Sequence, residues 1–101
     1  RKVKVGAYDW RIVLHDGDNE NHGQADFEFH RINLWPETFI DPTHSVGILI
    51  HELLHTIFGD RGLDTPEDDV EEQIVIGFET GLVSLFRDNP KLLTWIKRGL
   101  K

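Results

Sequence analysis

Five consecutive residues carry the strongest chemical signal in this sequence: His51-Glu52-Leu53-Leu54-His55. Two His four positions apart lie on the same face of a helix, so both imidazoles can point at one metal ion. The glutamate directly after the first His lies beside the same site, where a carboxylate can take a proton from metal-bound water and pass it on. The spacing therefore predicts a metal centre with Glu52 as general base.

Apolar residues recur at helical spacing around this motif and predict a helix from about Thr43 to Gly59. Asp41 or Thr43 is the expected N-cap. A buried His pair without a metal or another partner would be costly, which favours the metal centre. The alternative is an amphipathic surface helix in which His51 and His55 are incidental.

A third ligand must be His, Asp or Glu, because the sequence contains no Cys. No His follows His55, so the downstream candidates are acidic. In the next predicted helix, residues placed about 100° apart put Glu71 inside the apolar stripe and Glu72 near its other edge. A carboxylate on a buried face is costly unless it is paired or binds a metal. Glu71 is therefore the preferred third ligand, and Glu72 is the alternative.

The glutamate that does not bind the metal has two expected roles. It complements the dipole at the start of its helix, or it accepts a proton from a ligating imidazole.

The elements that must position this site begin with strands. Residues 3–14 are rich in Val, Ile and aromatic side chains, which predicts one strand or two short strands broken near Gly6. Residues 15–23 form a polar turn cluster. Residues 25–35 alternate with a change of phase, which predicts a small hairpin with its turn at His30-Arg31.

Helices follow the strands. A loop is expected over residues 59–66, then a second long helix over about 66–87 with Thr65 as its N-cap. Asn89-Pro90 interrupts this helix, and a short helix ends the chain. The predicted fold class is α+β: a small N-terminal antiparallel sheet or hairpin, two long helices and a short C-terminal helix.

Size and composition restrict the classes of protein further. A chain of 101 residues predicts a single domain over 1–101. The formal net charge of −7 argues against binding to nucleic acid or to an anionic membrane surface. No apolar run approaches the ~20 residues that span a bilayer. The absence of Cys excludes disulfide scaffolds and thiolate metal sites, and is compatible with a cytoplasmic protein.

The motif and the acidic helix after it resemble the zincin metallopeptidases, in particular the gluzincins with two His and one Glu. The chain length is similar to that of the minigluzincins. A closer resemblance is to small phage-encoded and bacterial metallopeptidase-like proteins, although Ile50 stands where Leu is expected. The residues that carry it are Tyr8-Asp9-Trp10, Ile50 to His55, Glu71-Glu72 and Arg87-Asp88-Asn89-Pro90.

This resemblance implies a zincin-like fold and zinc-dependent hydrolysis of a peptide or protein substrate. Zn²⁺ would be held by His51, His55 and Glu71 or Glu72, with water at the open fourth position. From similar folds, the segment 26–35 is expected to border the cleft and pair with a substrate backbone.

Two other hypotheses compete with a peptidase. One is a zincin-like metal-binding protein with little or no proteolytic activity that acts as a regulatory or phage host-interaction factor. A phage protein of this kind would act in the host cytoplasm. The other is a helical interaction module that binds no metal.

Overall fold

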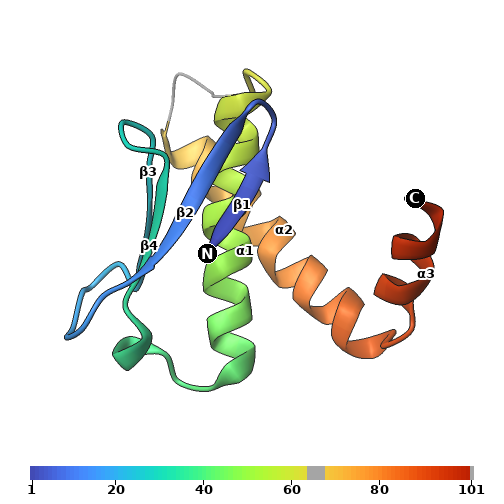
Figure 1. The fold of residues 1–101 in the computed structure, drawn as a ribbon. Coiled ribbons are helices and arrows are strands. Elements are labelled where there is room, and N and C mark those ends of the chain that lie inside the picture. Colours follow the sequence, from blue (N-terminus) through green and yellow to red (C-terminus); the bar gives the residue numbers. More distant parts are fainter. Residues whose placement is uncertain (64–67, 101) are drawn as a thin grey trace.

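The computed structural model describes residues 1–63 and 68–100. Strands precede helices, which confirms the α+β class. In Figure 1, α1 lies between the sheet and α2. The short helix α3 lies beyond the C-terminal end of α2, away from the sheet and α1. The elements are β1 (Lys2–Val5), β2 (Tyr8–Leu14), β3 (Gly23–Asp26), β4 (Arg31–Leu34), the 3₁₀ helix η1 (Pro36–Thr38), α1 (Pro42–Asp60), α2 (Asp68–Asp88) and α3 (Leu92–Gly99).

The four strands form a mixed sheet in the order β1-β2-β4-β3. The expectation of an antiparallel sheet is wrong for one pair, because β2 and β4 run parallel, with Ile12 opposite Ile32. β3 runs opposite to β2, and β4 reverses direction again before it pairs beside β2. Alternation along a segment predicts a strand and its faces, but it does not say which strands become neighbours.

The turns between paired strands lie close to the residues where they were expected. Gly6 and Ala7 form a two-residue turn between β1 and β2, and Gly6 has a φ of 59°, which suits glycine at the first position of such a turn. The second hairpin turns over residues 27–30, so its turn begins earlier than the expected His30-Arg31. The Asp26 carboxylate holds this turn by accepting hydrogen bonds from the backbone N–H groups of Glu28 and Phe29.

The boundaries of α1 follow from capping. Asp41, one of the two expected N-caps, accepts a hydrogen bond from the backbone N–H of His44 at 2.7 Å. The helix continues past the expected stop at Gly59, and Gly62 ends it with a φ of 65°. The expected cap of the second helix, Thr65, lies outside the described residues.

The hydrophobic core joins the sheet to α1. Ile32 is fully buried, and Gly23 lets β3 approach α1 closely, because a Cβ there would lie 2.8 Å from Ile48 Cγ2. This close approach brings the edge strand of the sheet next to the HELLH helix. The core consists of Val5, Trp10, Ile32 and Leu34, with Ile48, Leu49 and Leu53 of α1 packed against it.

Within residues 1–63 and 68–100, no helix combines the length and apolar character that crossing a bilayer requires.

Candidate metal centre

The two His of the motif face one another on α1. The i, i+4 spacing places their rings 4.9 Å apart, with His51 Nε2 and His55 Nε2 separated by 3.2 Å. Both side chains are largely buried, at 17% and 16% exposure. The sequence prediction that these two imidazoles converge on one point is confirmed.

Carboxylates of α2 hold the opposite nitrogens of both rings. His51 Nδ1–H donates to Glu79 Oε1 at 2.8 Å, and His55 Nδ1–H donates to Glu71 Oε2 at 2.7 Å. A carboxylate only accepts, so each Nδ1 carries the proton. In the neutral form with its proton on Nδ1, each imidazole presents an Nε2 lone pair, which is the form that binds a metal.

Glu72 completes the group at the Nε2 side. Its Oε1 lies 2.8 Å from His51 Nε2 and its Oε2 lies 3.1 Å from His55 Nε2. Two lone pairs and a carboxylate repel each other unless a proton or a metal ion lies among them. Donors that each lie ~2.0–2.1 Å from a tetrahedral ion are separated by about 3.3 Å. The spacing of these three side chains fits a shared metal ion.

His51, His55 and Glu72 thus form a group that could hold a metal, with one ligand atom from each lying within 4.8 Å of the others. Glu71, preferred from the sequence, instead bonds the far nitrogen of His55. The structure brings the alternative, Glu72, to the Nε2 atoms.

The helical-wheel preference for Glu71 treated the whole apolar stripe as buried. Ile74 and Phe78 of that stripe are exposed, at 37% and 57%. The face packed on α1 contains the fully buried Val75, which lies between Glu71 and Glu72 around the helix axis. Both glutamates therefore reach α1, one on each side of this contact.

Glu52 lies beside the two His and is nearly buried, at 7% exposure. Burial raises the pKa of its carboxyl above the ordinary 4.5, while His51 and His55 oppose the shift by lowering this pKa. The backbone of Ala25 on β3 also opposes the shift by lowering this pKa. The side chain is thus positioned to hold or release a proton next to the Nε2 atoms.

A pocket of about 530 Å³ opens over these groups. Gly23, Gln24 and Ala25 of β3 line one side of this pocket, and Phe27 also lines it. The expected border, segment 26–35, is only partly correct, because β4 lies inside the sheet and β3 is the edge strand.

Two residues of the site were not predicted from the sequence. Glu79 bonds His51, and Gly47 on α1 makes room for it, since a Cβ on Gly47 would lie 2.9 Å from Glu79 Oε2. The sequence contains a pattern that indicates the role of Glu79. Glu79 follows Glu72 by seven residues, so the two side chains share a face of the helix.

Comparisons with known proteins identify no relative of this chain. No protein-family model, curated protein or solved structure matches the chain. The resemblance to zincins therefore depends on the motif and on the geometry of this site.

Proposed function

We propose that this protein is a zinc-dependent metallopeptidase of the zincin type, with His51, His55 and Glu72 as the zinc ligands. The observation that carries the proposal is the convergence of two Nε2 atoms and one carboxylate at 2.8–3.2 Å from one another. Such a cluster of acceptors is stable with a cation at its centre.

The donor set favours zinc among the common metals. Imidazole with a single carboxylate is typical of catalytic zinc sites, whereas magnesium and calcium prefer oxygen ligands. With these three protein ligands, a bound zinc would keep a fourth position for water, as a hydrolytic centre requires. A closed structural site would need a fourth protein ligand.

Glu52 supplies the proton transfers. Zinc bound here would acidify a water molecule and polarise the carbonyl of the bond to be cleaved. Glu52 would take a proton at its carboxylate from the attacking water and deliver it to the leaving amine nitrogen. Its raised pKa suits a group that must accept a proton and then give it up.

The substrate of this proposal is an extended peptide. β3 is an edge strand and borders the pocket, so a peptide can pair with its backbone as an added strand. That pairing would draw the peptide backbone across the Nε2 atoms, with Phe27 of the pocket lining offering an apolar contact.

The decisive experiment combines metal analysis with cleavage of a peptide library by the purified chain. We expect one zinc per chain and cleavage that Glu52→Gln abolishes while zinc is retained. Glu28→Gln is the matched control. Glu28 is exposed on the hairpin turn, so this variant should cleave the peptides as the wild type does. Absence of stoichiometric zinc would overturn the proposal. Stoichiometric zinc without cleavage would favour a zincin-like binding protein instead.

A further inference from the structure

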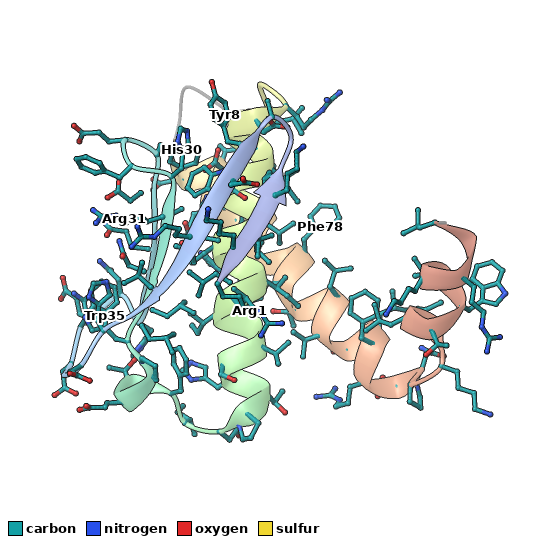
Figure 2. All side chains as sticks on the ribbon, in the orientation of Figure 1. Arg1, Tyr8, His30, Arg31, Trp35 and Phe78 are labelled. Carbon is teal, nitrogen blue, oxygen red and sulfur yellow. The ribbon has the colours of Figure 1, made fainter. Side chains whose placement is uncertain are left out.

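One face of α2 carries large apolar side chains that nothing in the described chain covers. Ile74, Phe78 and Leu85 recur at helical spacing and are 37%, 57% and 45% exposed. Figure 2 shows Phe78 projecting from α2 into open space. α2 packs on α1 through the adjoining face, where Val75 is fully buried. This outer face therefore has the character of an interface.

Two glycines form the floor of a groove along this face. Gly77 and Gly81 lie one helical turn apart, and a Cβ on either would meet nothing within 4 Å. Glycine weakens the middle of a helix, and no contact among the described residues explains its use at these two positions. The groove, of about 470 Å³, is lined by Ile74, Gly77, Phe78, Gly81, Leu82 and Leu85.

We propose that a second copy of this chain occupies the groove, with the two α2 helices packed antiparallel about a twofold axis. In the register that centres the groove, Phe78 of one copy lies over Gly81 of the other, and Leu82 lies over Gly77. Each large side chain then enters the space above a glycine, which lets the two helices approach closely. A twofold axis repeats both contacts on the two copies.

Charge favours the antiparallel direction over the parallel one. The first turns of α2 carry Asp69, Glu71 and Glu72, whereas α3, beyond the other end of α2, is basic. An antiparallel pair brings the acidic end of one helix toward the basic end of its partner and also opposes the helix dipoles favourably. A parallel pair would place acidic end beside acidic end. The basic residues of α3 and the turn before it are Lys91, Lys97 and Arg98.

The dimer leaves the metal centre open. The carboxylates of Glu71, Glu72 and Glu79 are directed toward His side chains on α1, although Glu71 lies only about 20° from Phe78 around the helix axis. Assembly and metal binding can therefore be tested independently of one another.

Sedimentation of the full chain over a range of concentrations tests the assembly. We expect a species of twice the chain mass, and Phe78→Glu should raise the dissociation constant at least about 30-fold, as for a central contact residue. Ile76→Glu is the matched control, because Ile76 is exposed on the opposite side of α2 and should leave the dimer intact. A wild-type monomer at all concentrations, or equal effects of the two variants, would overturn the proposal.

A second measurement tests the direction of packing. The chain has no Cys, so Ile74→Cys and Leu85→Cys, one of them isotope-labelled, can be mixed and joined with a short bis-maleimide. Antiparallel packing in the proposed register predicts cross-links between the two different variants. Cross-links of each variant with itself would show parallel packing and overturn the proposed arrangement, as would a dimer with no cross-link at these positions.

Discussion

Glu79 Oε1 accepts a hydrogen bond from His51 Nδ1–H at 2.8 Å, so a residue of α2 orients an imidazole of the candidate metal centre on α1. Glu71 does the same for His55 at 2.7 Å. One helix thus supplies both orienting carboxylates as well as Glu72, whose oxygens face the Nε2 atoms. The packing of α2 on α1 is therefore part of the site, and several predictions can be made from it.

Glu79→Gln should weaken zinc binding by about 10–100-fold, the usual effect of removing a carboxylate that orients a ligating His. The amide can still accept a hydrogen bond, but it lacks the charge that raises the basicity of the ring. Competition with a chelator of known affinity measures the change. Asp69→Asn removes a charge from an exposed position on the same helix and should have little effect. Equal affinities of the Glu79 variant and the wild type would rule out this role.

Gly47→Ala should weaken zinc binding without lowering the free energy of unfolding of the metal-free protein. A Cβ at Gly47 would lie 2.9 Å from Glu79 Oε2, the end of a flexible side chain, so Glu79 should move rather than α1. Alanine is also favoured over glycine inside a helix by about 1 kcal/mol. Chelator competition and urea unfolding on the same sample separate the two effects. A fall in stability with unchanged zinc affinity would contradict this expectation.

Glu72→Ala should weaken zinc binding more than Glu71→Ala, and by more than the ~100-fold upper range for an orienting residue. Glu72 faces both Nε2 atoms, whereas Glu71 touches Nδ1 of His55 alone. The two variants remove the same side chain from adjacent positions, so each serves as the control for the other. The reverse order of affinities would assign Glu71 as the third ligand.

Asp26→Asn should destabilise the protein at neutral pH and have a smaller effect in acid. The Arg31 guanidinium, which donates a hydrogen bond to Asp26, holds the pKa of that carboxyl below its ordinary value of 3.8. A carboxyl with a lowered pKa in the folded state stabilises that state above its unfolded pKa. This contribution is lost as the pH falls through the folded pKa. Asp26 also caps the β3–β4 turn, so the loss should affect the wall of the pocket.

Urea unfolding at neutral pH and below pH ~3.9 measures this dependence. Asp18→Asn, in an exposed loop, is the control and should show no such change with pH. A difference between the Asp26 variant and the wild type that stays constant with pH would exclude the Asp26–Arg31 interaction as its cause.

The sequence by itself determined the features that depend on local geometry. His51 and His55 share a face because a spacing of four residues is close to one helical turn, whatever surrounds the helix. Asp41 was among the expected caps because a short acceptor side chain satisfies the first free N–H groups. The α+β class was also predictable, because alternation and helical periodicity are local properties of each segment. They gave strands first and helices afterwards.

The tertiary structure alone decided which groups from separate segments meet. The parallel pairing of β2 and β4 depends on where the second hairpin docks. The choice of Glu72 over Glu71 to face the Nε2 atoms depends on the rotation of α2 about its own axis. Neighbouring residues differ by about 100° around a helix, so a modest rotation exchanges their roles. That rotation is set by the packing of Val75 against α1, a contact between segments that the pattern of either helix alone does not contain.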